Sequence, residues 1–279
     1  MAITPDLIGL CSPARDVSWD VDDVLLYAVA VGAGQDDPTR ELNLTTENSD
    51  GVVTQALPTY ANIVTRGRPE FELDMSKMVH AEQDFSLPNP LSTSGRGSLR
   101  TEVTNVEDKG SGALISIDGV LEDAQSAEVL ARTTQRLFVR GAGGFGSSSA
   151  PRREPWVVPD RAPDSETVGN VRPEQALLYR LTGDRNPLHS DPAFAQRSGF
   201  AQPILHGMCT YGITGRLLVR EICGGDPARL TGMSGRFTKP ALTGIPLTVR
   251  IWVDGDEARF QTLQDGAVIL DRGTARISQ

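Results

Sequence analysis

The chain has 279 residues, 39% of them hydrophobic, which is enough for one large domain or two ordinary ones with a buried core. Its formal charge of -9, without any run of Lys or Arg, argues against a nucleic-acid-binding protein. No stretch approaches about 18 uninterrupted apolar residues, so we expect no membrane-spanning helix.

The first half is predicted to contain a sheet and one short helix. The helix begins near Tyr60 but meets Gly67 and Pro69, so it can last only about two turns. A sheet whose core helix is cut short would leave a tunnel beside it. The strands are expected at Gly97 to Val106, Ala113 to Leu121 and Val129 to Val139, with a turn at Asp108-Lys-Gly110.

A segment rich in Gly, Ser and Pro, residues 141–163, separates this half from the next and is typical of an interdomain linker. It contains Gly141-Ala-Gly-Gly-Phe-Gly146, which matches the G-x-G-x-x-G pattern of dinucleotide sites. Such a site needs a helix to begin there, and Ser147 to Pro151 does not favour one. We therefore expect no nucleotide site.

The second half has clearer helices. Pro173 and Glu174 are expected to open an apolar-periodic helix that Gly183 ends. Asp191-Pro192 is typical of a helix N-cap followed by a first-turn proline. A longer helix, from about Gly207 to Cys223, is apolar on most sides and should be buried.

Alternating strands follow that helix, with hairpin turns at Asp254-Gly255 and Asp265-Gly266. The pattern predicts an α+β fold in which an antiparallel sheet wraps around one apolar helix. The halves, residues 1–140 and 164–279, also share a weak repeat at an offset of about 150 residues, which favours a duplication. The matches are Leu26-Tyr27 with Leu178-Tyr179, Asp37-Pro38 with Asp191-Pro192, and Phe85-Ser-Leu-Pro88 with Phe237-Thr-Lys-Pro240.

The loop after Gly183 holds the strongest candidate site. Asp184, Asn186 and His189 lie close together in Tyr179-Arg-Leu-Thr-Gly-Asp184-Arg-Asn186-Pro-Leu-His189. A carboxylate and an imidazole that can share one water are what general acid/base addition of water requires. Each residue alone is also an ordinary turn former, so only the combination points to catalysis.

Other chemistries fit these residues less well. Asp191 is expected to cap a helix rather than act in the site. A metal site could use Asp184, His189, Asp191 and His206, but no recognised ligand spacing occurs, so we expect no metal. Cys209 lies inside an apolar helix and no Gly-x-Ser-x-Gly elbow is found, which argues against nucleophilic catalysis.

A third element of the site is predicted where Pro203-Ile-Leu-His206-Gly207 turns into the buried helix. The first amides of a helix have no internal acceptor and lie at its positive end, so the Gly207 N–H can stabilise an oxyanion. A tight turn would also explain this glycine. His206 and His80 are expected to be structural.

The motif from Tyr179 to Pro192, followed by Gly199-Phe-Ala-Gln-Pro-Ile-Leu-His206-Gly207, closely resembles that of the MaoC-like, R-specific enoyl-CoA hydratases (hydratase 2). Nearly the whole chain is similar to the two-domain members of this family. The first half carries the resemblance in Thr45-Thr-Glu-Asn, Leu57-Pro-Thr-Tyr60, His80-Ala-Glu-Gln83, Asp108-Lys-Gly-Ser-Gly112 and Arg140-Gly-Ala-Gly-Gly-Phe-Gly146.

The resemblance implies a double hot-dog fold, in which two antiparallel sheets, each wrapped on a central helix, are fused as a pseudo-dimer. The second half would keep the catalytic motif and the first would accommodate bulky acyl groups. It implies that Asp184 and His189 activate water, Asn186 orients it, and the Gly207 N–H binds the thioester oxygen. The first-half stretch Gly32 to Asp37, which matches the catalytic loop, lacks an imidazole. The implied reaction is reversible syn hydration of a trans-2-enoyl thioester to the (3R)-3-hydroxyacyl thioester.

Coenzyme A, or an acyl carrier protein, would enter with the substrate, and no other cofactor is expected. Arg185, Arg236 and Lys239 are the basic residues nearest the motif that could meet its phosphates. Fusion of two halves supplies the pairing that a single hot-dog unit obtains by dimerising, so a homodimer is possible but not required.

Two competing functions remain open. The same fold also serves thioesterases, which would release free thiol, and a non-catalytic acyl-thioester binding module would bind without turnover. The three cysteines form no Cys-x-x-Cys pair, and the chain shows neither a secretory signal at Met1 nor a Ser-Lys-Leu peroxisomal address at Gln279. We therefore expect a cytoplasmic protein.

Overall fold

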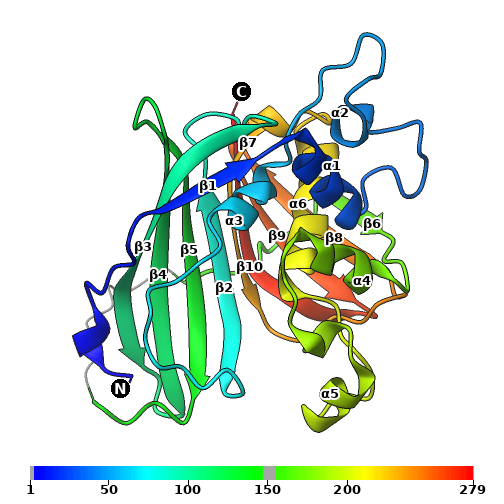
Figure 1. Cartoon of the computed structure of the whole chain (residues 1–279). Helices are drawn as coiled ribbons and strands as arrows, with labels where there is room; N and C mark the ends of the chain where they lie inside the picture. The colour runs from blue at the N-terminus through cyan, green and yellow to red at the C-terminus, as the bar shows by residue number, and fades with distance from the viewer. Residues whose placement is uncertain (1–2, 147–154, 279) are drawn as a thin grey trace.

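The computed structural model describes residues 3–146 and 155–278 and contains one extended antiparallel sheet (Figure 1). The first half contributes β1 (Arg15–Trp19), β2 (Met78–Ser86), β3 (Gly95–Asp108), β4 (Gly112–Asp123) and β5 (Val129–Arg140). The second half contributes β6 (Ser165–Gly169), β7 (Leu230–Phe237), β8 (Leu247–Asp254), β9 (Glu257–Gln264) and β10 (Ala267–Ile277).

These strands lie in the order β1-β3-β4-β5-β2-β7-β10-β9-β8-β6. Each half therefore repeats one strand order, mirrored about the β2–β7 pair, in which Phe85 lies opposite Met233. The double hot-dog fold is confirmed, but the two antiparallel sheets expected of it form one continuous sheet in the described residues, because β2 and β7 pair. No edge is exposed between the halves, because β2 and β7 pair through their backbones.

The helices lie on the concave face of the sheet (Figure 1). They are α1 (Val21–Ala30), α2 (Leu42–Thr45), α3 (Ala61–Val64), α4 (Gln175–Tyr179), α5 (Pro192–Arg197) and α6 (Gly207–Ile222). Single turns of 3-10 helix are η1 (Pro5–Leu7), η2 (Pro58–Tyr60), η3 (Arg180–Thr182), η4 (Pro187–His189) and η5 (Pro227–Arg229). None of the helices of the described residues is long and apolar enough to cross a bilayer.

The helix α6 is the buried centre of the molecule, as predicted, and ends at its C-cap Cys223. Two of its glycines bring the halves into close contact. A Cβ at Gly212 would lie 2.5 Å from Cγ1 of Val31 in the first half, and one at Gly215 would lie 2.4 Å from Cγ2 of Thr59. Only glycine allows so short a distance between the two halves at these positions.

The counterpart of α6 in the first half is short, as Gly67 and Pro69 predicted. It consists of η2 and α3 and ends at Val64. Beyond it, the sheet carries a second buried apolar cluster, separate from the main core and partly covered by Phe71 and Leu73. Its members are Leu7, Val103, Val106, Ala113, Ile115, Ile117, Leu137 and Val139. The tunnel expected at this place stays a prediction.

Two sequence-based expectations need correction or addition, and a third is confirmed. The second-half helix begins at Gln175 with Glu174 as its N-cap, so Pro173 precedes the helix rather than opening it. The strands β1 and β2 were not expected, whereas the turn of Asp265 and Gly266 has the positive φ values that its sequence favours, 48° and 75°.

The described part of the predicted linker is attached to the outer face of the second half. The indole N–H of Trp156 donates to the Gly273 carbonyl at 3.1 Å, and that of Trp252 donates to the Arg161 carbonyl at 3.0 Å. The segment Ser147 to Pro151, on which the argument against a nucleotide site depended, lies outside the described residues.

The glycine-rich stretch just before that segment has a partner within the chain. The carboxylate of Asp108 accepts hydrogen bonds from the amides of Gly110, Gly144 and Gly146, at 2.7, 3.0 and 2.7 Å. These bonds hold the pKa of Asp108 below its usual range. The amides that a phosphate would need are thus already satisfied by an internal anion.

Candidate active site

The catalytic loop begins where Gly183 ends η3 with φ of 110°, a backbone conformation that favours glycine. The Asp184 carboxylate then accepts the Asn186 amide at 3.2 Å. Asn186 in turn caps η4, since its Oδ1 accepts the Leu188 amide at 3.0 Å. The side-chain Nδ2 of Asn186 and the second lone pair of its Oδ1 are left for the water-orienting role predicted for it.

His189, at the end of η4, is held in one orientation. Its Nδ1 lies 2.9 Å from the Ile204 carbonyl oxygen, which can only accept, so Nδ1 carries the proton. The neutral ring therefore presents a free lone pair at Nε2. Burial lowers the pKa of His189, which keeps the ring neutral at neutral pH.

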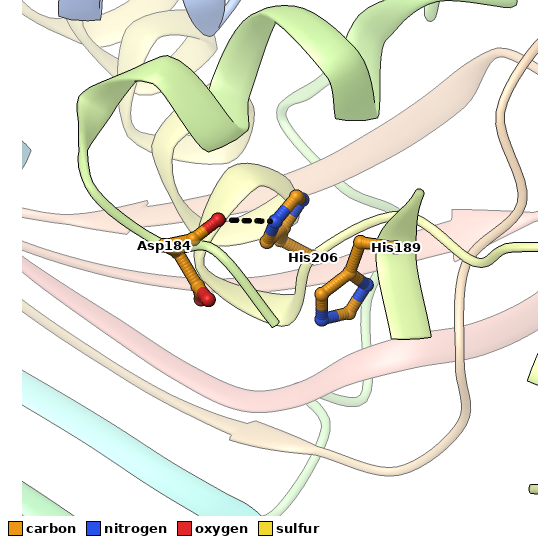
Figure 2. Close-up of side chains that lie close together, drawn as sticks. All are labelled: Asp184, His189 and His206. Atoms are coloured by element: carbon orange, nitrogen blue, oxygen red, sulfur yellow. Dashed lines mark hydrogen bonds between the residues drawn. The ribbon is translucent and has the colours of Figure 1, made fainter. Parts of the chain in front are cut away.

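Asp184 and His189 are close enough to share one water molecule. A carboxylate oxygen of Asp184, a ring nitrogen of His189 and one of His206 all lie within 4.8 Å of one another. A water that makes two hydrogen bonds of about 2.8 Å can bridge groups at such a separation. The two residues singled out from the sequence are thus brought together as predicted (Figure 2).

The same three residues suit a metal ion poorly. The rings of His189 and His206 stack, with centroids 3.8 Å apart and planes inclined by 26°. Imidazole lone pairs lie in the ring plane, so two stacked rings do not direct them at one point. Chelation would require the stack to open.

His206, which was expected to be structural, lies in the middle of the site. In Figure 2 its ring is drawn between Asp184 and His189. Its Nε2 lies 3.3 Å from the backbone oxygen of Asp184, and its ring lies against that of Tyr179, with centroids 4.9 Å apart and planes inclined by 52°. The sequence carried no signal for this role beyond the position of His206 directly before Gly207.

Gly207 is the first residue of α6 and is exposed, so its amide is accessible at the helix N-terminus. A Cβ on it would lie 3.4 Å from the ring of Phe237. That ring contacts His80 of β2 edge-on, at 5.2 Å between centroids, and the charge of Asp184 acts on the pKa of His80. His80 of the first half therefore lies beside the site, which its position in the sequence did not indicate.

The remaining predicted residues are spread around this centre. Asp191 caps α5, accepting the amides of Ala193 and Phe194 at 2.8 and 3.2 Å, as expected. Arg185 and Lys239 are exposed near the loop and near the end of β7. In the strand register Arg236 lies opposite Glu82 and Asp271. Its side chain is on the face of β7 opposite to Phe237 and the site.

An ion pair lies beside the first-half loop of residues 32–37, which matches the loop from Asp184 to His189. Arg216 of α6 is 1% exposed and donates to both carboxylate oxygens of Glu41, at 3.0 and 2.9 Å. Its Nε donates to the Val31 carbonyl at 3.0 Å, beside Gly32. A guanidinium and a carboxylate thus lie near the place that corresponds, in the first half, to the dyad of Asp184 and His189.

The fold and site agree with comparisons to known proteins. Residues 18–141 match the MFE-2 hydratase 2 N-terminal domain, and residues 156–272 match the MaoC like domain. A MaoC-like dehydratase from Phytophthora capsici superimposes with a TM-score of 0.89 at 28% identity, covering 100% of this chain and 98% of that one. A Mycobacterium tuberculosis structure described as a double hotdog fold has a TM-score of 0.56 at 14% identity.

Two curated relatives match over most of their length. The 3-hydroxyacyl-thioester dehydratase Y of Mycobacterium tuberculosis is 43% identical, over 96% of this chain and 98% of its own. The peroxisomal enoyl-CoA hydratase 2 of Arabidopsis thaliana is 34% identical, over 90% of this chain and 87% of its own. With the double hot-dog fold and the motif from Asp184 to His189, the chain belongs to the MaoC-like family of enoyl-CoA hydratases 2 and 3-hydroxyacyl-thioester dehydratases.

Proposed function

We propose that this protein is a hydro-lyase that reversibly hydrates trans-2-enoyl-CoA to (3R)-3-hydroxyacyl-CoA at the site formed by Asp184, His189 and Gly207. The observation that carries the proposal is the separation of at most 4.8 Å between a carboxylate oxygen of Asp184 and a ring nitrogen of His189, which one water can bridge. The names of the relatives support the same reaction.

In the hydration direction, His189 accepts a proton from the bridging water through Nε2, while Asp184 holds the water by its other hydrogen. The water oxygen bonds to the β-carbon as the double bond breaks, and charge moves to the thioester oxygen. The Gly207 amide stabilises that enolate, at a value of about 3 to 4 kcal/mol for a fixed donor. The proton taken up by the dyad then goes to the α-carbon on the same face.

This reaction adds water and moves one proton, so the proposed chemistry needs neither a redox group nor a metal. All three predicted basic residues are exposed, but Arg236 lies on the face of β7 opposite to the site, so position favours Arg185 and Lys239 for the carrier phosphates. We also propose that the first half accommodates the acyl group, because α3 stops at Val64 and leaves the sheet beyond it without a central helix. Assembly as a homodimer stays a prediction. Cytoplasmic placement also stays a prediction, since the Arabidopsis thaliana relative is named peroxisomal.

The test is hydration of crotonyl-CoA by Asp184→Asn and His189→Gln. Loss of a positioned acid or base should lower kcat by about 10²- to 10⁴-fold in folded protein. The matched control is Asp191→Asn, the same substitution on the same loop, because Asn also caps helices and should keep the wild-type rate. Near-wild-type rates in the first two variants would disprove the assignment.

The same assay separates the competing functions. Hydration consumes the enoyl absorbance and leaves the thioester intact, whereas a thioesterase releases a free thiol that a thiol reagent detects. Chiral analysis of the product should give the (3R) isomer. Binding of the substrate without either change would indicate a non-catalytic module.

A further inference from the structure

His206 makes two contacts that a residue filling the core would not need. It occupies the N-cap position of α6, where Ser, Thr, Asp or Asn would bond the first amides, but its side chain makes no such bond. The ring turns toward the catalytic loop instead, and its Nε2 lies 3.3 Å from the Asp184 carbonyl. At 1% exposure it is enclosed by the residues of the site.

The two contacts hold the two catalytic residues. A carbonyl only accepts, so Nε2 of His206 carries a proton and fixes the backbone of Asp184. The face of the same ring lies against His189 at 3.8 Å between centroids. The Ile204 carbonyl fixes the rotation of the His189 ring, while the stack fixes its plane.

The surroundings keep His206 uncharged. Burial, followed by the neighbouring His189, lowers the pKa of His206 to about 4, and Arg66 acts in the same direction. Asp184 opposes this shift, Tyr179 adds a neutral phenol, and His80 faces Asp184 from β2. A neutral ring matters here, because His189 gains a proton during the reaction and a charged neighbour in the stack would oppose it.

We propose that His206 is a positioning residue, which sets the separation of Asp184 and His189 through its N–H and its ring. The inference rests on the proposed hydratase function. It also explains why Gly207, the amide donor, directly follows His206: one N-terminal turn of α6 then supports the carboxylate, the imidazole and the oxyanion donor together.

Two variants separate the two contacts. His206→Gln can still donate an N–H toward the Asp184 carbonyl but has no ring, whereas His206→Phe keeps a ring and loses the N–H. Each should lower kcat by about 10- to 100-fold with KM changed less than about 3-fold, since small misplacements of catalytic groups have effects of this size.

Their pH profiles should differ. In His206→Gln, water reaches His189, so the acid limb of kcat/KM should move up toward the ordinary histidine value of about 6.5. In His206→Phe, His189 stays covered and the limb should stay at the wild-type position. A role in stability alone would move neither kcat nor the limb.

Cys223→Ser is the matched control, because Cys223 is also buried and caps the other end of α6. It should reduce stability and leave kcat and the pH profile unchanged. Wild-type kcat and pH profiles in both His206 variants, alongside inactive Asp184→Asn, would overturn the inference and leave the proposed function intact. Activity in Asp184→Asn would instead remove the function on which the inference rests.

A measurement on the wild-type enzyme avoids any folding defect of the variants. The chain has 3 histidines, so long-range proton–nitrogen NMR spectra can resolve each ring. We expect His206 to remain neutral with its proton on Nε2 down to about pH 4, and His189 to carry its proton on Nδ1. A His206 ring protonated on Nδ1, or titrating near 6.5, would contradict the proposal.

Discussion

The proposed action of Asp184 and His189 as a dyad depends on which ring nitrogen of His189 carries a proton. The backbone carbonyl of Ile204 decides this, because it holds the proton on Nδ1. The proximity of Asp184, Asn186 and His189 could be predicted from the sequence because one short motif contains them, and Gly207 could be singled out because a helix begins there. His206 and His80 could not, since their place in the site depends on ring contacts and on a strand of the other half. Arg236, predicted to meet the carrier phosphates, is next to Phe237 in sequence but lies on the opposite face of β7.

Ionisation of the Asp84 carboxyl group opposes folding. It lies on β2 at the junction of the halves, and burial raises its pKa to about 6, against the attraction of Arg136 and Arg276. The folded state therefore binds a proton at Asp84 more readily than the unfolded state. The resulting penalty is full above about pH 6 and disappears as the pH falls below about 4.

Asp84→Asn should consequently raise the free energy of unfolding at pH 8 by about 1 kcal/mol, after allowance for its partial exposure, and change it little at pH 4. Urea unfolding at both values measures this. Asp265→Asn, in an exposed turn whose left-handed backbone Asn tolerates, should show no such pH-dependent difference. Destabilisation of Asp84→Asn at pH 8 would mean that the arginines need its charge.

At the scale of elements, the helices and strands with a periodic apolar pattern could be predicted from the sequence, and a strand rich in polar residues could not. The helix α6 and the strands β3, β4, β5 and β8 follow their hydrophobic spacing, and the breakers after α3 set its length. The strand β2 was missed because a central strand with Gln83, Asp84 and Glu82 lacks the apolar alternation of a half-buried strand. Its polar residues are accommodated by partners such as Asn62, whose Oδ1 accepts from Gln83 at 2.7 Å.

The close packing between the two halves can be tested by substituting the glycines of α6. Gly212→Ala adds a methyl group 2.5 Å from Val31 and 2.7 Å from the Tyr27 hydroxyl, so it should destabilise the protein by about 1 to 3 kcal/mol. Alanine otherwise favours a helix over glycine, which makes any loss a consequence of packing. Gly207→Ala on the same helix meets Phe237 only at 3.4 Å and should keep the wild-type melting temperature.

At the scale of the whole molecule, the sheet and the main core both run across the halves. The core cluster includes Tyr27 and Tyr60 of the first half with Tyr211 of the second. The duplication could be anticipated from a few ordered identities. The register of β2 against β7 could not, because pairing between distant strands leaves no local pattern.

We expect the halves to unfold together. Trp19 reports on the first half, where its indole donates to Ser92 at 2.9 Å, and Trp252 reports on the second. Variants that each keep one of these tryptophans, with the others changed to Phe, should show coincident urea transitions by fluorescence. Two separated midpoints would mean that the β2–β7 pair and α6 do not couple the halves.

The ion pair of Arg216 and Glu41 has a consequence for how such a chain can change over time. Loss of Glu41 leaves the guanidinium of Arg216, 1% exposed, buried without its carboxylate, at a cost of about 3 to 5 kcal/mol, so Glu41 cannot be replaced alone without endangering the fold. Restoring an acid and an imidazole to residues 32–37 would place them beside this guanidinium. A lineage that has acquired the pair can therefore gain a second acid–imidazole site at this place only if Arg216 and Glu41 change together.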